Sequence, residues 1–66
     1  MAYTYVKRYK IMEVSADGLL KEPRRFYTGS VFREYYDTEQ DAIDDIIKEG
    51  YSGNLVILTA MTKVWG

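Results

Sequence analysis

A capped helix followed directly by an apolar strand is the feature of this sequence that most constrains its fold. Thr38 stands where a helix N-cap is expected, and Asp41 follows three residues later, in the spacing of a capping box. Apolar residues then recur at helical spacing, which predicts a helix near residues 38–49 that ends at Gly50 in a left-handed cap. Because a helix of about three turns is marginal in isolation, its apolar stripe must pack on another element. The stripe consists of Ala42, Ile43, Ile46 and Ile47.

Segments rich in β-branched and aromatic residues predict three strands around this helix. They cover residues 3–14, 25–35 and 55–64. We therefore expect a small single α+β domain over residues 1–66, with the element order β-β-α-β. The expected sheet has three antiparallel strands in the order 2-1-3, with the one helix packed on one face.

The last strand has two apolar faces, and one helix can cover only one of them. Its even-numbered residues are more uniformly small and apolar, so we assign that face to the helix. The other face then carries an outward patch formed by Leu55, Ile57 and Met61. Exposed apolar patches of this kind mark interaction sites. We expect the chain to bind another protein there, or a second copy of itself in a homodimer or higher oligomer.

The chain has 66 residues and contains neither cysteine nor histidine. Domains of this size bury only about 60% of their unfolded surface, and they usually add a disulfide, a metal or a partner subunit. A disulfide is impossible here and the usual zinc and haem ligands are missing, so we expect no metal and no cofactor. Oligomerisation is the remaining way for a chain of this size to gain stability. No apolar run approaches the roughly 20 residues that span a bilayer, and we expect a cytoplasmic protein without membrane contact.

Charge is distributed unevenly along the chain, although the net charge is only −1. Residues 1–34 carry seven basic and four acidic side chains, whereas residues 35–66 carry two basic and six acidic ones. The acidic side of the predicted helix is one candidate surface for a protein partner. It consists of Asp41, Asp44, Asp45 and Glu49.

Basic and aromatic side chains of the first two predicted strands form the alternative surface. Cations there would neutralise phosphates while aromatic rings stack on bases, which predicts contact with a nucleic acid or a nucleotide. The candidate residues are Lys7, Arg8, Lys10, Arg24, Arg25, Tyr9 and Tyr27.

The sequence contains no motif of enzymatic chemistry. Asp37, Glu39 and Asp41 have the first spacings of a calcium-binding loop. That pattern fails at Ala42 and Lys48, where glycine and glutamate are required. No glycine-rich phosphate loop is present, and without histidine a serine triad of the ordinary kind lacks its base. We therefore expect no catalytic residues and no enzyme activity.

These observations favour a small non-enzymatic protein-binding or regulatory module that acts by occupying a partner's surface. In size and composition the chain is similar to small proteins encoded by phages, which implies an inhibitor or an adaptor. The alternative is a binder of nucleic acid or nucleotide that uses the basic strands.

Overall fold

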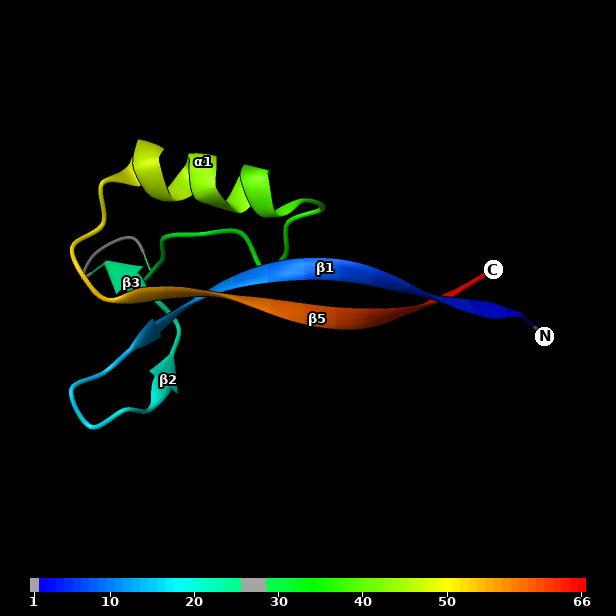
Figure 1. Cartoon of the computed structure of the whole chain (residues 1–66), viewed down its shortest axis with the longest axis horizontal. Coiled ribbons are helices and arrows are strands. Elements are labelled where there is room, and N and C mark those ends of the chain that lie inside the picture. Colours follow the sequence, from blue (N-terminus) through cyan, green and yellow to red (C-terminus); the bar gives the residue numbers. More distant parts are fainter. Residues whose placement is uncertain (1, 26–28) are drawn as a thin grey trace.

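A long twisted ribbon of two strands forms the backbone of the molecule, and one helix lies along part of it (Figure 1). The computed structural model describes residues 2–25 and 29–66. Its elements are β1 (Tyr3–Val14), β2 (Leu20–Lys21), β3 (Arg24–Arg25), β4 (Gly29–Ser30), α1 (Glu39–Glu49) and β5 (Leu55–Trp65). The small α+β fold with one helix and a three-stranded antiparallel sheet is therefore confirmed.

β1 is the central strand of the larger sheet, whose order is β2-β1-β5. β1 and β5 pair antiparallel without interruption, from Tyr3 opposite Trp65 to Glu13 opposite Leu55. β2 adds only two residue pairs, at the far end of β1. β3 and β4 form a separate two-stranded sheet. The ribbon therefore extends well beyond the rest of the chain, and both termini lie at its projecting end (Figure 1).

The strand predicted over residues 25–35 is wrong for the described part of that range. Arg25 and Gly29 instead pair with each other across β3 and β4, and the Val31 N–H donates to the Pro23 carbonyl at 3.2 Å. Gly29 has φ +76°, a left-handed conformation that glycine adopts without a Cβ clash and that an extended strand does not contain. The segment therefore cannot run along β1 as one extended strand, and Leu20–Lys21 pairs with the end of β1 instead.

The predicted helix caps are present. The Thr38 hydroxyl accepts a hydrogen bond from the Asp41 N–H at 3.1 Å. At the other end Gly50 has φ +59°, and its N–H donates to the Ile46 carbonyl at 3.2 Å. These contacts satisfy backbone groups that a helix leaves without partners at its termini, and they place α1 at Glu39–Glu49.

A small core lies between α1 and the half of the ribbon that is farther from the termini. Its buried hydrophobic residues are Ile11, Tyr36 and Ala42. Partly buried side chains surround them, namely Tyr9, Phe32, Ile46, Leu55 and Ile57. Tyr36 reaches this core because it forms an isolated antiparallel bridge to Tyr9, with backbone hydrogen bonds in both directions.

The assignment of the faces of the last strand is wrong. Ile11 lies opposite Ile57 in the register, and both belong to the core with Leu55. The odd-numbered face therefore turns toward α1, because Ile57 on this face lies beside Ile11, which is buried in the core. The helix stripe is also narrower than expected, since Ile47 remains 73% exposed.

Candidate functional site

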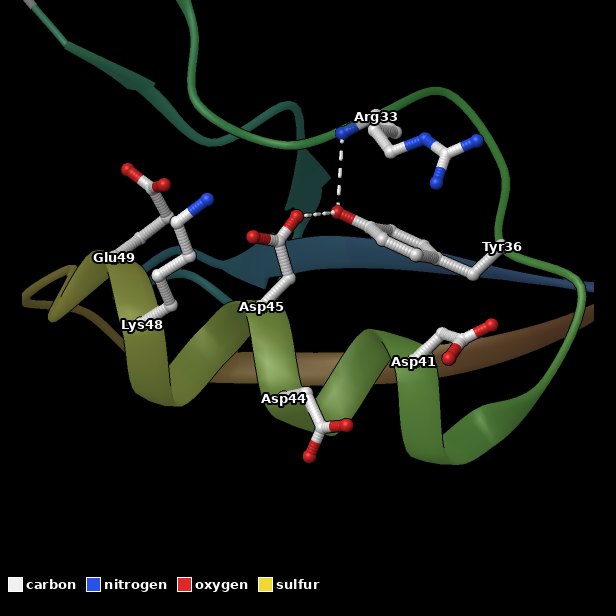
Figure 2. A pocket seen from close by; sticks show the side chains of 7 residues that line it. All are labelled: Arg33, Tyr36, Asp41, Asp44, Asp45, Lys48 and Glu49. Atoms are coloured by element: carbon white, nitrogen blue, oxygen red, sulfur yellow. Dashed lines mark hydrogen bonds between the residues drawn. The ribbon is translucent and has the colours of Figure 1, made fainter.

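A hollow of about 560 Å³ lies between α1 and the segment that precedes it (Figure 2). Its lining consists of Arg33, Tyr36, Asp41, Asp44, Asp45, Lys48 and Glu49. We call it the acidic hollow, since four carboxylates face two cations. The structure thus brings together the four helix residues that the sequence predicted as a protein-binding surface.

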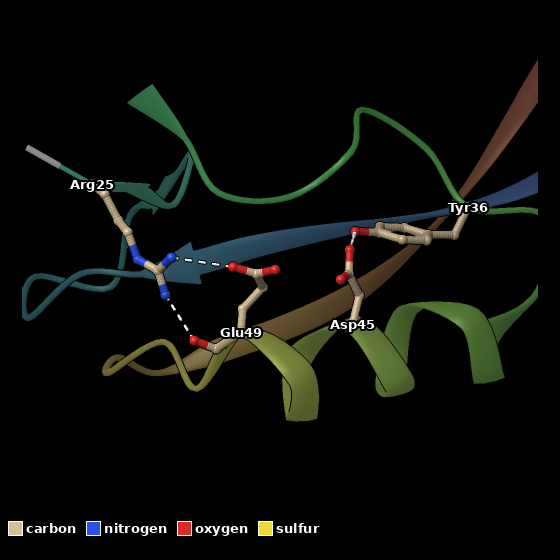
Figure 3. Close-up of polar contacts among 4 residues, drawn as sticks. All are labelled: Arg25, Tyr36, Asp45 and Glu49. Atoms are coloured by element: carbon tan, nitrogen blue, oxygen red, sulfur yellow. Dashed lines mark hydrogen bonds and ion pairs between the residues drawn. The ribbon is translucent and has the colours of Figure 1, made fainter. Parts of the chain in front are cut away.

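Tyr36 forms the fixed wall of the acidic hollow. Its side chain is only 2% exposed, and its hydroxyl accepts the Arg33 N–H at 3.1 Å. The same hydroxyl donates to Asp45 Oδ2 (Figures 2 and 3). Burial, and then the hydrogen bond to Asp45, raise the pKa of Tyr36 to about 12. Tyr36 therefore keeps its proton at neutral pH and holds Asp45 in place.

Glu49 is held from the other side by Arg25 (Figure 3). Arg25 Nη1 donates to Glu49 Oε1 at 3.1 Å, and Nη2 donates to the Glu49 main-chain carbonyl at 2.7 Å. The guanidinium therefore neutralises the carboxylate and satisfies a carbonyl at the end of α1, where a cation is favoured. The charge of Glu49 is thus already paired with a cation of the same chain.

Asp41 and Asp44 are the open acids of the hollow. Both are exposed, and across residues 2–25 and 29–66 no cation lies within ion-pair distance of either carboxylate. Asp44 accepts only the Gln40 side-chain amide, at 2.9 Å. In Figure 2 the two side chains extend from the helix without contacting the Tyr36 hydroxyl. Their negative charge is available to an external group.

The predicted apolar patch is not formed. Leu55 and Ile57 pack against the core, whereas Met61, on the same face, is 61% exposed. Exposed rings gather farther along the ribbon instead, where Tyr3 contacts Tyr5 and Trp65 with centroids 5.6 and 5.1 Å apart. Sequence reasoning missed this cluster because it depends on the register that places Tyr3 opposite Trp65.

The predicted basic surface is largely neutralised within the chain. Arg8 pairs with Asp37, Lys10 pairs with Glu22 at 2.9 Å, and Arg25 pairs with Glu49. Lys7 lies 5.9 Å from the centre of the Tyr9 ring. Tyr27 lies outside the described residues. These contacts leave little positive charge for a phosphate backbone.

Arg24 belongs to a hollow of mixed charge. This hollow measures about 380 Å³, and its lining consists of Lys10, Glu22, Arg24, Ser30, Phe32 and Glu34. Two cations therefore face two carboxylates, which makes the hollow a poor site for an anion.

Across residues 2–25 and 29–66, no three aspartate or glutamate side chains lie close enough together to hold one metal ion. The helix of the described residues is too short and too polar to cross a bilayer. No protein-family model, curated protein or solved structure matches this chain.

Proposed function

We propose that this chain is a non-enzymatic protein-binding module that occupies a basic segment of a partner with its acidic hollow. The observation that carries the proposal is the contrast between the charges of the two candidate surfaces. Arg8, Lys10 and Arg25 of the basic surface are ion-paired within the chain, whereas Asp41 and Asp44 are open to solvent.

Lysine or arginine is the partner side chain that fits this hollow. A guanidinium or ammonium placed between Asp41 and Asp44 would form charge-assisted hydrogen bonds, and the rigid Tyr36 wall limits the conformations that the site must give up on binding. Such contacts increase the rate of association and the specificity for a partner more than they raise the affinity. The module would therefore recognise a basic partner surface, in the manner of an inhibitor or adaptor.

Binding of nucleic acid or nucleotide is the second candidate function. It would use Lys7 and Arg24, the two cations of the basic surface that form no ion pair across the described ranges. Lys7 contacts the Tyr9 ring, and Arg24 lies in the neutral hollow. The contrast in charge therefore favours the protein partner.

The test compares a labelled lysine- and arginine-rich peptide with a labelled single-stranded oligonucleotide, by fluorescence anisotropy over a series of salt concentrations. The peptide should bind and the oligonucleotide should not. Asp41→Lys should abolish peptide binding, whereas Glu39→Lys should preserve most of it. The two variants are matched, because both residues are acids of the first turn of α1 and only Asp41 lines the hollow.

Two outcomes would contradict the proposal. Equal weakening by Asp41→Lys and Glu39→Lys would show that the peptide responds to net charge alone. Oligonucleotide binding with a steep salt dependence would favour the basic surface, because release of counterions from phosphates produces that dependence.

A further inference from the structure

β5 has an open edge along its whole length. It lies at one side of the larger sheet, and no other strand of the described residues pairs with its outer edge. In an antiparallel strand, the N–H and C=O of one residue both point to the strand on one side, and those of the next residue both point to the other side. The Val14 N–H donates to the Asn54 carbonyl and the Gly66 N–H donates to the Ala2 carbonyl, so the backbone groups of the even-numbered residues of β5 point toward β1. The backbone groups of the odd-numbered residues point to the open edge. We call these the outward residues: Leu55, Ile57, Thr59, Met61, Lys63 and Trp65.

Such an edge is a template for another strand. β5 pairs with β1 over eleven residues without a bulge, contains no proline, and carries a single charge at Lys63. Bulges, prolines and charged side chains are the features that protect exposed edges in proteins, and β5 has only the one charge. The open stretch of β1 is shorter and is better protected, because it ends at Lys7 and at the ion pair of Arg8 with Asp37.

We propose that the outer edge of β5 binds β5 of a second copy of this chain, antiparallel about a two-fold axis at Ala60. This surface is separate from the acidic hollow, so the proposal does not depend on the proposed function. In this register Leu55 lies opposite Trp65 of the second copy and Ile57 lies opposite Lys63. All six outward residues then exchange backbone hydrogen bonds across the interface.

The strand is complementary to itself in this arrangement. The two Ala60 residues meet at the axis as a non-hydrogen-bonded pair, where opposite Cα atoms approach to about 4.5 Å and a small side chain fits. The one charge of the edge lies opposite an isoleucine instead of opposite its own copy, so like charges are not directly opposed. A two-fold contact buries the same surface on both copies and closes the assembly at two chains.

α1 would cover the second copy's strand. Asp45 points to Tyr36 on one flank of the helix, and at roughly 100° per residue Ile43 and Ile47 lie about 160° away, on the opposite flank. In Figure 2, β5 lies beyond β1 as seen from Tyr36, so this opposite flank is the one nearer the open edge. A partner explains the 73% exposure of Ile47 and the 59% exposure of Trp65.

The surface of the single chain has the excess that a dimer of this kind requires. The chain exposes 4979 Å², against roughly 4300 Å² for a compact protein of 7.7 kDa. Its radius of gyration is 13.5 Å, against about 11 Å for a compact chain of this length. The excess of roughly 700 Å² is close to the ~800 Å² that each partner buries in a standard interface.

Single cysteines test the register, because the natural chain has none. Ala60→Cys places two thiols across the axis at a separation that a disulfide can bridge, so mild oxidation should yield a species of twice 7.7 kDa. Thr62→Cys is the matched control two residues away. Its two thiols would lie about 13 Å apart along the strands and should not crosslink.

The unmodified chain and Met61→Lys are compared by light scattering at low and high micromolar concentration. The unmodified chain should be dimeric, whereas Met61→Lys should have the mass of one chain because it adds two lysines beside the axis. Leu19→Lys is the control, since Leu19 is 65% exposed and lies in the turn before β2, and it should remain dimeric.

Circular dichroism shows whether Met61→Lys is folded, and the cysteine pair decides the question if it is not. A monomeric unmodified chain at every concentration would overturn the proposal. A dimer that survives in folded Met61→Lys would also overturn it, as would equal crosslinking of the Ala60→Cys and Thr62→Cys chains.

Discussion

The hydroxyl of Tyr36 donates a hydrogen bond to the carboxylate of Asp45, and this bond fastens the segment before α1 to the middle of the helix. Tyr36 is also bridged to Tyr9 of β1 through its backbone. Tyr36 thus links the ribbon, the segment before α1 and the helix itself. The wall of the acidic hollow is therefore built from a residue that also stabilises the fold.

Tyr36→Phe should lower the free energy of unfolding by about 1–2 kcal/mol, because it removes the donor to Asp45 and the acceptor of the Arg33 N–H. The measurement is urea denaturation followed by circular dichroism. Tyr35→Phe is the control, since the neighbouring ring is 37% exposed and its variant should change stability by less than about 0.5 kcal/mol. Equal losses in the two variants would show that the Tyr36 bonds contribute nothing specific.

Alkaline pH should unfold the chain through the same hydroxyl. The pKa of Tyr36 is raised from 10.0 to about 12, so the folded state binds this proton more tightly than the unfolded state. The resulting stability is fully present below pH 10 and is lost as pH rises toward 12. A shift of this size corresponds to roughly 2–3 kcal/mol.

The free energies of unfolding of the unmodified chain and of Tyr36→Phe, measured from neutral pH to pH 12, should therefore approach each other as the pH rises. Tyr51→Phe is the informative control, because the hydrogen bond to Glu13 and burial also raise the pKa of Tyr51. The Tyr51→Phe chain should keep the part of the alkaline transition that Tyr36 causes. A gap between the first two curves that stays constant with pH would contradict the assignment to Tyr36.

Local features of the sequence predicted the structure best. The helix and its two caps depend on contacts within a few residues of Thr38 and Gly50, so their spacing alone was sufficient. The candidate site was predicted in part for the same reason, because Asp41, Asp44, Asp45 and Glu49 share one side of a helix. Such a pattern shows which residues lie together but not which of them the rest of the chain neutralises.

Features that depend on distant contacts could not be predicted from the same pattern. Both faces of β5 are apolar, so the face that meets α1 is decided by the pairing of Ile11 with Ile57. The pairing of β3 with β4 likewise has no counterpart in the alternation of apolar residues. Tyr36 gave no local signal, because its burial depends on the backbone bridge to Tyr9.

The core predicts a steep difference between two isoleucines. Ile11→Ala should lower the free energy of unfolding by about 2–5 kcal/mol, because Ile11 is 1% exposed and its removal leaves a cavity under α1. Ile47→Ala should have a much smaller effect on the separated chain, since Ile47 is 73% exposed. Chemical denaturation at low protein concentration measures both. Similar losses in the two variants would contradict the core described for the single chain.

Gly50 offers a test of the backbone alone. Its φ of +59° is in the left-handed region, and a Cβ added there would meet no atom within 4 Å. Gly50→Ala should therefore cost about 1–2 kcal/mol from the backbone conformation, without a steric clash. Gly50→Asn should cost less, because asparagine adopts this conformation more readily.

The control for this last series is Gly66→Ala, where a Cβ also meets nothing within 4 Å and φ lies outside the left-handed region. It should leave the urea midpoint of unfolding unchanged. The order of stability should then be the unmodified chain and Gly66→Ala, followed by Gly50→Asn and finally Gly50→Ala. If Gly50→Asn were as costly as Gly50→Ala, loss of flexibility in general would explain the data, and the left-handed cap would not be what ends α1.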